Sequence, residues 1–204
     1  MDEVVRLALA KWPNVPHCYG WLALDARGAF RMRDEAAQAA NLPGEVIRHP
    51  ALLGFIFRNY GCDGRGAWFF QNGPQRVYVE LEATPFIART DPALGFMTHD
   101  GEAMSKISHV FMTTDARLLL QSDDKLAMLD DRDLAECLPR LTLAGMPCDD
   151  LALMSWLASS TSANTLRFSL NENFWDIERI SSDHLEQRFG FIAHPGRLTK
   201  NLSR

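Results

Sequence analysis

Six polar or aromatic residues within the segment 58–76 have side chains that could form a binding site. They are Arg58, Asn59, Trp68, Gln71, Asn72 and Arg76. Guanidinium and amide groups beside an aromatic ring are typical of sites that hold a small polar or anionic ligand, and of hot spots that contact a protein partner. A structural role is the alternative, in which Arg58 and Asn59 cap a helix while Gln71 and Arg76 are exposed strand residues.

Two acid–base pairs provide a second alternative, an enzyme. Glu80 and Glu82 lie two residues apart in a segment with strand periodicity, so their carboxylates share one face and could serve as general acid and base. His99 and Asp100 could form an imidazole–carboxylate pair, although neighbouring strand residues point to opposite faces. Either pair would need the fold to assemble the rest of the site.

The sequence lacks the motifs that usually mark a cofactor, a metal or a nucleophile. Gly61, Gly64 and Gly66 follow a predicted helix and lead into a strand, the reverse of a dinucleotide-binding loop. There is no Gly-Lys-Ser/Thr, no G-x-S-x-G and no H-E-x-x-H, and the four cysteines form no C-x-x-C pair. We therefore expect turn glycines, no metal, no cofactor and no assigned catalytic residue.

Composition excludes two classes of partner. The net charge of −5 disfavours a nucleic-acid binder, which needs a basic surface, and it disfavours docking on an anionic membrane. The start, MDEVVRLALAKWP, carries acids where a signal peptide carries bases, and no apolar stretch approaches the length of a membrane span. A cytoplasmic protein is expected.

Alternating apolar residues predict that strands dominate the chain. Hairpins are expected at 19–33 and 67–82, the second around Asn72-Gly73. A meander is expected from four further strands, at 94–98, 106–113, 117–121 and 126–129. Later strands are expected at 166–170, 174–180 and 190–193.

Helical spacing of apolar residues predicts the remaining elements. The clearest helices are expected at 49–60, 131–141 and 149–158, with shorter ones before Pro13 and near 182–189. Residues 34–44 are expected to form a short helix or an ordered loop. The fold class that follows is α+β, with mostly antiparallel sheets, built from hairpins and a meander, and three or four helices.

The polar segment SSTSANT, 159–165, suggests where the chain divides. We expect a main α+β domain over 1–158 and a C-terminal strand–strand–helix–strand unit over 159–204. Three similar strings lie at predicted turns, namely DARGAF (25–30), DGRGAW (63–68) and DARLLL (115–120). They indicate either a duplicated hairpin-plus-helix unit or independent use of Asp and Gly in turns.

A resemblance to known families rests on the blocks FIFRNYGCDGRGAWFFQNGPQRVYVELEATPF, GWLALDARGAFRMRDE, THDGE and LDDRDLA. Over about residues 17–140 the chain resembles a proteobacterial family known only as a domain of unknown function. It is more distantly similar to a second uncharacterised bacterial family, whose fold repeats strand–helix motifs and for which a signalling role has been suggested. The resemblance implies a repeated α+β fold and supplies no catalytic residues; the string DARLLL lacks the glycine of the other two.

These observations favour a cytoplasmic, non-enzymatic binding or regulatory module for a small polar or anionic ligand or a protein partner. The six residues of segment 58–76 are its candidate site. A small-molecule enzyme that uses carboxylates or histidine remains an alternative. A structural or assembly protein is a third, and it would have a large apolar interface and no pocket.

Overall fold

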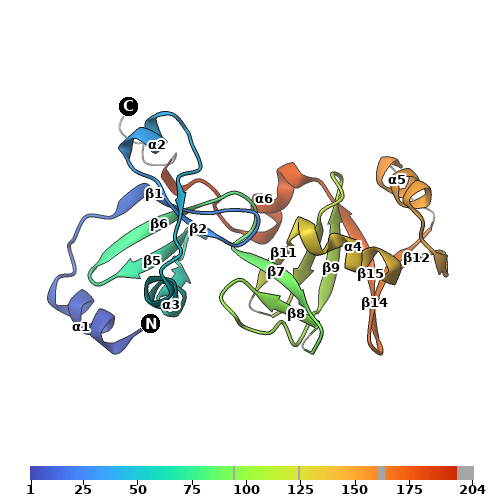
Figure 1. Ribbon diagram of the computed structural model, residues 1–204, viewed down its shortest axis with the longest axis horizontal. Helices are drawn as coiled ribbons and strands as arrows, with labels where there is room; N and C mark the ends of the chain where they lie inside the picture. Colours follow the sequence, from blue (N-terminus) through green and yellow to red (C-terminus); the bar gives the residue numbers. More distant parts are fainter. Residues whose placement is uncertain (94, 124, 160–163, 197–204) are drawn as a thin grey trace. The chain divides into compact units, whose positions relative to one another are not determined.

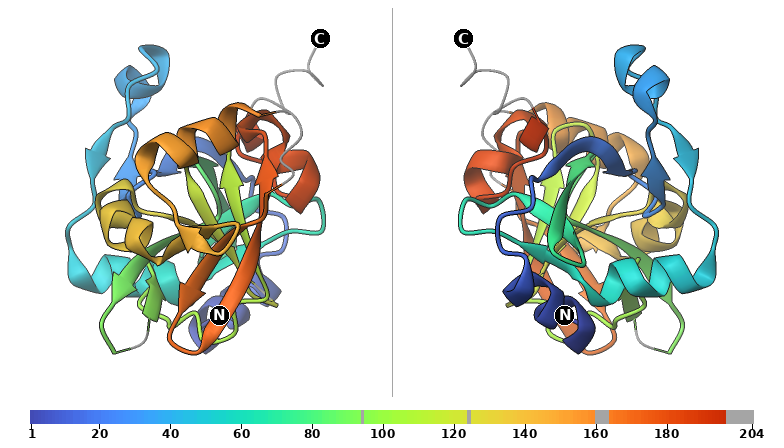
Figure 2. Two further views of the ribbon diagram at one scale, coloured as in Figure 1. Left: turned by 90° about the vertical axis from the view of Figure 1, so that its right-hand side faces the viewer. Right: turned by 90° about the vertical axis from the view of Figure 1, so that its left-hand side faces the viewer.

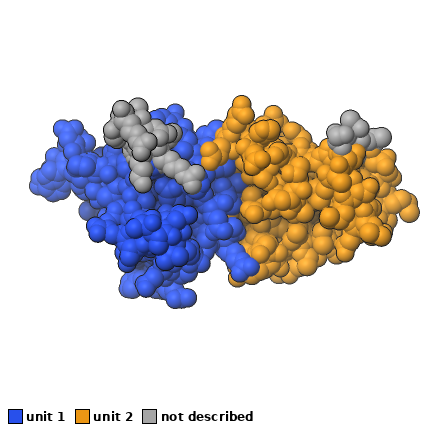
Figure 3. Space-filling view, turned by 90° about the horizontal axis from the view of Figure 1, so that it is seen from above, with its two compact units in different colours: residues 1–85, 189–204 blue, residues 86–188 orange. Residues whose placement is uncertain are grey.

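The computed structural model describes residues 1–93, 95–123, 125–159 and 164–196. Its contacts divide the chain into two compact units (Figure 3). Unit 1 comprises Met1–Pro85 and the C-terminal segment that begins at Phe189, and unit 2 comprises Phe86–Arg188. Among the described residues, none of the helices is both long and apolar enough to cross a membrane.

Unit 1 is a six-stranded sheet with the strand order β3-β2-β1-β6-β5-β4 (Figure 1). Its elements are α1 (Glu3–Lys11), β1 (Cys18–Leu24), β2 (Phe30–Met32), α2 (Glu35–Ala39), β3 (Glu45–Val46), α3 (Pro50–Arg58), β4 (Tyr60–Cys62), β5 (Trp68–Asn72) and β6 (Gln75–Leu81). The β1–β2 and β5–β6 hairpins confirm the two predicted hairpins. The centre of the sheet is the parallel pair of β1 and β6.

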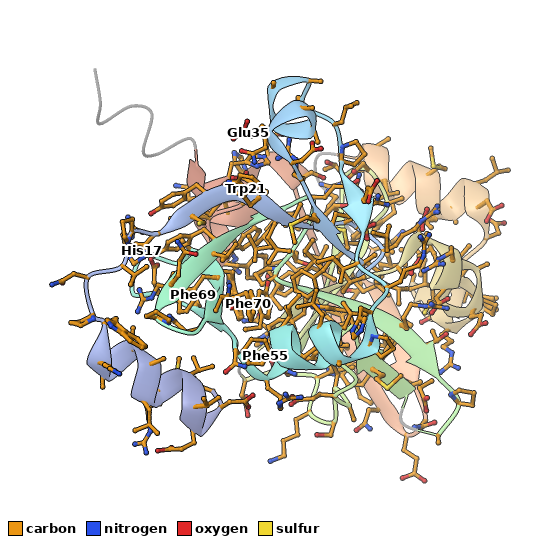
Figure 4. The ribbon with its side chains drawn as sticks, turned by 60° about the vertical axis from the view of Figure 1, so that its left-hand side comes forward. His17, Trp21, Glu35, Phe55, Phe69 and Phe70 are labelled. Carbon is orange, nitrogen blue, oxygen red and sulfur yellow. The ribbon has the colours of Figure 1, made fainter. Side chains whose placement is uncertain are left out.

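Helix α3 covers one face of the unit 1 sheet with aromatic side chains. Phe55 meets Phe70 of β5 edge to face at 5.4 Å between ring centroids (Figure 4), and Phe57 meets Phe30 of β2 at 6.0 Å. The helix begins at Pro50, which is tolerated in a first turn because its missing N–H would have no partner there. This packing buries the α3 side of the sheet in an apolar interface.

Unit 2 is a nine-stranded sheet with the order β13-β12-β14-β15-β9-β10-β11-β7-β8. Its strands are β7 (Phe86–Asp91), β8 (Gly95–Thr98), β9 (His109–Thr113), β10 (Leu118–Gln121), β11 (Leu126–Leu129), β12 (Leu141–Leu143), β13 (Met146–Pro147), β14 (Leu166–Leu170) and β15 (Asn173–Ile180). The helical segments are η1 (Asp131–Asp133), α4 (Leu134–Cys137), η2 (Leu138–Arg140), α5 (Asp150–Ala158), η3 (Ser182–His184) and α6 (Leu185–Phe189). Helix α5 lies beside the sheet of unit 2 (Figure 2). Arg179 of β15 donates to the Trp156 carbonyl of α5 at 2.8 Å and so links this helix to the sheet.

Both sheets contain the same arrangement of six strands. The order β3-β2-β1-β6-β5-β4 of unit 1 recurs in unit 2 as β11-β10-β9-β15-β14-β12. In each unit the central pair is parallel, β1 with β6 and β9 with β15, and the outer pairs are antiparallel. Each strand of unit 1 therefore has a topological counterpart in unit 2, and the duplication of a hairpin-plus-helix unit stays a prediction.

The three similar strings do not all occupy the same place in their turns. Asp25 Oδ1 accepts hydrogen bonds from the amides two and four residues later, at 3.0 and 2.8 Å, and Asp63 Oδ1 does the same at 2.9 and 3.0 Å. In the third turn this position belongs to Thr113, whose Oγ1 accepts from the Arg117 amide at 2.9 Å. The letters DARLLL therefore begin two residues late, at Asp115, and the string matches the others by composition rather than by position.

The α+β class is confirmed, and two details of it are corrected. The sheets are mixed, because β1–β6, β9–β15 and β7–β11 are parallel pairs. The described residues hold six α-helices rather than three or four. The count rises because short segments such as 34–44 do form helices: α2 has five residues and begins after Asp34, whose carboxylate accepts from the Ala37 amide at 2.7 Å.

The expected strand at 190–193 is wrong. Gly190 has a φ of +70°, which is outside the strand region, and the segment forms only an isolated bridge between Ile192 and Ala67 within the described residues. Of the expected linker 159–165, residues 160–163 lie outside the described residues.

Candidate functional site

Two of the six predicted site residues join helices α1 and α3. Arg58 donates to the Asp2 carboxylate at 3.1 Å, and this hydrogen bond holds the pKa of Asp2 below its usual value. Asn59 is buried at the end of α3, where its Oδ1 accepts from the Asp2 amide at 2.8 Å and its Nδ2 donates to the Phe55 carbonyl at 2.9 Å. Both side chains thus form hydrogen bonds to other residues of unit 1.

The other four lie along the β5–β6 hairpin. Gln71 is fully buried, with its Nε2 donating to the carbonyl of Gly73 in the turn at 2.9 Å. Its Oε1 is buried without a hydrogen-bond partner among the described residues. Asn72 is exposed at the end of β5.

Trp68 and Arg76 each lie against an aromatic ring. The Trp68 and Tyr60 ring centroids are 4.8 Å apart, and the guanidinium of Arg76 lies 4.5 Å from the centre of the Phe69 ring. None of the six predicted residues lines a cavity that lies in unit 1.

This cavity, the unit 1 pocket, has a volume of about 480 Å³. Side chains from β1, β2, α2, the loop after α2, the end of β6 and the C-terminal segment line it. Leu22 and Leu24 of β1 are buried, so strand alternation places Ala23 between them on the opposite face, where it lines the pocket. The pocket therefore lies on the face of the sheet that α3 does not cover.

Three residues on neighbouring strands form a row across the pocket floor. Ala23 of β1 pairs with Arg31 of β2 on one side and with Glu80 of β6 on the other. Neighbouring strands lie about 4.8 Å apart, so the backbones of Arg31 and Glu80 are roughly 10 Å apart. Because only a methyl group projects between them, the row is low at its centre and charged at both ends.

The β2 side of the pocket is cationic. Arg31 Nε pairs with Asp25 Oδ2 at 2.8 Å, and its Nη1 donates to the Gly44 carbonyl at 3.2 Å. Arg33, two residues later, donates to the Leu42 carbonyl at 3.0 Å. Within the described part of the chain no carboxylate forms an ion pair with Arg33, so this guanidinium keeps an unbalanced charge.

The β6 side is anionic. Glu80 is largely buried, its Oε2 lies 3.0 Å from Nδ1 of the half-exposed His194, and its Oε1 accepts from the Gly196 amide at 3.3 Å. Glu82 Oε2 accepts from the Ala26 amide at 3.1 Å, and no cation of the described residues pairs with it. Histidine and glutamate meet here although 114 residues separate them.

Gly20 brings the α2 side of the pocket close to β1. Its φ is +80°, a conformation that favours glycine, and Gln38 Oε1 lies 2.6 Å from where a Cβ would stand. Gln38 Nε2 in turn donates to the Arg33 carbonyl at 3.0 Å. A side chain at position 20 would displace this wall of the pocket.

An aromatic cluster supports the pocket from behind Tyr19. The Tyr19 ring, which lines the pocket, stacks on Tyr78 with 4.7 Å between centroids and 3° between planes. The Tyr78 hydroxyl donates to Asp63 Oδ2 at 3.0 Å. Burial alone would raise the pKa of Asp63, but hydrogen bonds from the Arg65 side chain and from the amides of Arg65 and Ala67 lower it to about 2. Asp63 is therefore ionised, and its hydrogen bond holds the Tyr78 ring in place.

The second predicted acid–base pair lies in unit 2. His99 Nδ1 accepts from the Ile87 amide at 3.2 Å, while Asp100 pairs with Lys125 at 3.2 Å. Burial would raise the pKa of Asp100, but the Thr98 hydroxyl and the Lys125 charge lower it. His99 Nδ1 and the Asp100 carboxylate thus contact separate neighbours in unit 2.

The side chains that line the unit 1 pocket determine the chemistry that it can support. Its described lining holds three carboxylates, two guanidinium groups and one imidazole, and it holds no aliphatic hydroxyl, thiol or amine that could act as a nucleophile. Among the described residues, no three His, Cys, Asp or Glu side chains are placed so that together they could hold a metal ion. The lining suits ionic recognition, and the Glu80–His194 pair could also move a proton.

Comparison with known proteins gives a family without an assigned function. A family model described as "Protein of unknown function (DUF2946)" matches residues 1–196, so the expected relation to an uncharacterised family is confirmed. The solved structures include a DUF1285 family protein from Silicibacter pomeroyi DSS-3, which is 10% identical, covers 91% of this chain and 99% of its own, and has a TM-score of 0.47. No curated protein matches the chain.

Proposed function

The chain belongs to this family of unknown function, and we propose that it is a cytoplasmic, non-enzymatic module that binds a small polar ligand in the unit 1 pocket. The observation that carries the proposal is the pocket floor, in which Ala23 separates Arg31 from Glu80. A volume of about 480 Å³ falls within the range of small-molecule sites, which is roughly 300–1,000 Å³. A few charged groups around a cavity of this size are the usual design of such a site.

Two observations support a binding or regulatory role over covalent catalysis by a hydroxyl, thiol or amine of an aliphatic side chain. The described lining offers no serine, threonine, cysteine or lysine. The charged groups are held by backbone and side-chain partners, as in the Asp25–Arg31 pair, so they are positioned before a ligand arrives. Preorganised charge favours tight binding because little is lost in ordering it. A signalling role would follow if binding altered a partner surface.

A cytoplasmic location is part of the same proposal. The four cysteines, Cys18, Cys62, Cys137 and Cys148, are free in the structure. Burial raises the pKa of the Cys137 thiol to about 11, so this thiol is protonated and unreactive at neutral pH. Free thiols of this kind fit a reducing compartment.

A thermal-shift screen over metabolites and nucleotides tests the proposal when it is run on the wild type and on Ala23→Phe. The phenyl ring would fill the low centre of the floor, so a ligand that raises the Tm of the wild type should leave the Tm of Ala23→Phe unchanged. Ala10→Phe is the matched control, because it adds the same ring at an exposed position of α1. A screen without any stabilising ligand, or a ligand that stabilises Ala23→Phe equally, would contradict the proposal.

An acid–base enzyme is the second candidate, and the 3.0 Å contact of Glu80 with His194 is the observation that favours it. A carboxylate that orients an imidazole is a common arrangement for a general base. Incubating the screened ligand with the protein and analysing it by NMR separates the candidates. An unchanged ligand supports the binding module, whereas a product that disappears with His194→Gln supports the enzyme.

A further inference from the structure

We propose that two copies of this chain form a dimer in which their α5 helices pack antiparallel through the outward-facing side of each helix. This surface, the α5 face, consists of Leu151, Met154, Ser155 and Ala158. The α5 face belongs to unit 2 and includes no residue of the unit 1 pocket.

Helix α5 lies in a connection that is much longer in unit 2 than in unit 1. Strands β4 and β5 of unit 1 correspond to β12 and β14 of unit 2, and in unit 1 the short turn 63–67 joins them. In unit 2 the same connection, 144–165, contains β13 and α5. Figure 1 shows α5 at the β12 end of the sheet. The strand arrangement that both units share therefore does not require this helix.

Helix α5 is apolar on both sides. Leu153, Trp156 and Leu157 are buried on its inner side. On its outer side Leu151 is 82% exposed and Met154 is 63% exposed. The outer positions recur at intervals of three and four residues, as one side of a helix does, and none of them carries a charge. A surface helix normally has a polar outer side, so an apolar one indicates that another surface covers it.

The two ends of α5 carry opposite charges. Asp150 is exposed in the first turn of the helix. Arg179 of β15 lies at the last turn, where it donates to the Trp156 and Leu157 carbonyls at 2.8 and 3.3 Å. Neither Asp150 nor Arg179 forms an ion pair with another described residue. The α5 face thus lies between an unbalanced negative charge and an unbalanced positive charge.

This pattern of charges is complementary to itself when two such helices run antiparallel. In a dimer with a two-fold axis, the same surface of both subunits forms the interface. Antiparallel helices bring Asp150 of each copy near Arg179 of the partner subunit, and the apolar residues meet between the two pairs. Parallel helices would instead place like charges together at both ends. A second copy of this chain therefore satisfies the apolar residues and both charges at once, which is the reason to assign the α5 face to it.

Sedimentation equilibrium of the wild type from about 1 μM to about 1 mM measures the association. A nine-residue helix makes a small interface, so we expect a dissociation constant within this range. Leu151→Lys should raise the dissociation constant at least about tenfold, because each dimer would bury two ammonium groups. Leu7→Lys is the matched control, because it places the same charge at an exposed leucine of α1 in unit 1.

Two results of this experiment would overturn the inference. One is a wild type that stays monomeric at about 1 mM, and the other is a dimer that Leu151→Lys and Leu7→Lys weaken equally. Leu151 is exposed, so its substitution should leave the Tm of the monomer unchanged. If Leu151→Lys lowers this Tm, Met154→Lys takes its place, because it puts the same charge on the α5 face one turn later.

The direction of the helices is tested by removing one charge. Asp150→Asn should weaken the antiparallel dimer several-fold, because two attractive charge pairs are lost from each dimer. Parallel helices predict a tighter dimer, because the repulsion between the two Asp150 side chains is removed. Glu3→Gln is the control, because Glu3 is an exposed carboxylate in the first turn of α1. A dimer of Asp150→Asn that is as tight as that of Glu3→Gln, or tighter, would overturn the antiparallel arrangement.

Discussion

The two units share one strand arrangement, but the same three positions form a pocket floor in unit 1 and are mostly apolar in unit 2. When the β1–β2 hairpin of unit 1 is aligned with the β9–β10 hairpin of unit 2 at their turns, Ala23 corresponds to Phe111. Arg31, which pairs with Ala23, then corresponds to Leu119. Across the parallel pair, Glu80 corresponds to Glu178. The row that is a charged pocket floor in unit 1 is therefore apolar at two of its three positions in unit 2.

Side-chain size at the central position accounts for much of this difference. Phe111 is 2% exposed and Leu119 is fully buried, so unit 2 fills the space that Ala23 leaves open in unit 1. The sheet topology itself does not dictate a pocket. A pocket appears where a methyl group stands between two long charged side chains, and a packed core appears where an aromatic ring stands there.

The largest expected effect is on the stability of unit 2. Phe111→Ala should lower its free energy of unfolding by about 3–5 kcal/mol, because a buried ring is replaced by a cavity. Ala23→Phe, the reverse exchange in unit 1, should change stability by less than about 1.5 kcal/mol, because the ring enters open space. Urea unfolding, followed separately for each unit, measures both values. A cost for Ala23→Phe as large as that for Phe111→Ala would show that position 23 is not open.

A smaller effect on stability is expected from the Asp63 carboxylate, which accepts a hydrogen bond from Tyr78 in the stack with Tyr19. The pKa of Asp63 is lowered from 3.8 to about 2, so ionised Asp63 stabilises the fold above about pH 4 and this stabilisation is lost as the pH falls through 2. Asp63→Asn should therefore cost about 1–2 kcal/mol at neutral pH and little near pH 2. Thermal unfolding across this pH range is the measurement.

The control for Asp63 is Asp176→Asn in unit 2. Asp176 forms an exposed ion pair with Arg167, and such pairs contribute about 0–1 kcal/mol. If Asp63→Asn had the same small effect at every pH, the carboxylate would not be what holds Tyr78 in the stack.

The smallest expected effect compares the two corresponding glutamates. Glu178 pairs with Arg188 at 3.1 Å, and both side chains are about half exposed, so Glu178→Gln should change stability by less than about 1 kcal/mol. Glu80→Gln should leave the stability of unit 1 similarly unaffected but should weaken ligand binding, because Glu80 lines the pocket. Calorimetric titration of both variants checks this difference. Equal affinities would place Glu80 outside the binding site.

Local patterns in the sequence were enough to predict the hairpins and the shared face of Glu80 and Glu82. Alternation between apolar and polar residues extends over a few neighbours, and a hairpin pairs those neighbours directly. Both glutamates do line the pocket. The same i, i+2 spacing in Arg31 and Arg33 is visible in the segment RMR and was the available signal for the opposite side.

The sequence could not show which strands lie next to each other across long separations. The parallel pairing of β1 with β6 brings Ala23 beside Glu80, and the C-terminal segment brings His194 to the same carboxylate. Both contacts join residues that are far apart in the chain, and no periodicity encodes them. For the same reason the polar cluster of segment 58–76 was predicted from neighbours in sequence, whereas the pocket is built from segments that meet only in the folded unit.

The ligand site is tested most directly by the affinity of Ala23→Phe for a ligand that binds the wild type, measured by isothermal titration calorimetry. The substitution installs in unit 1 the ring that unit 2 carries at the corresponding position. Binding should be lost in Ala23→Phe, whereas Ala10→Phe should bind as the wild type does. An affinity of Ala23→Phe equal to that of the wild type would contradict the claim that the gap over Ala23 is the ligand site.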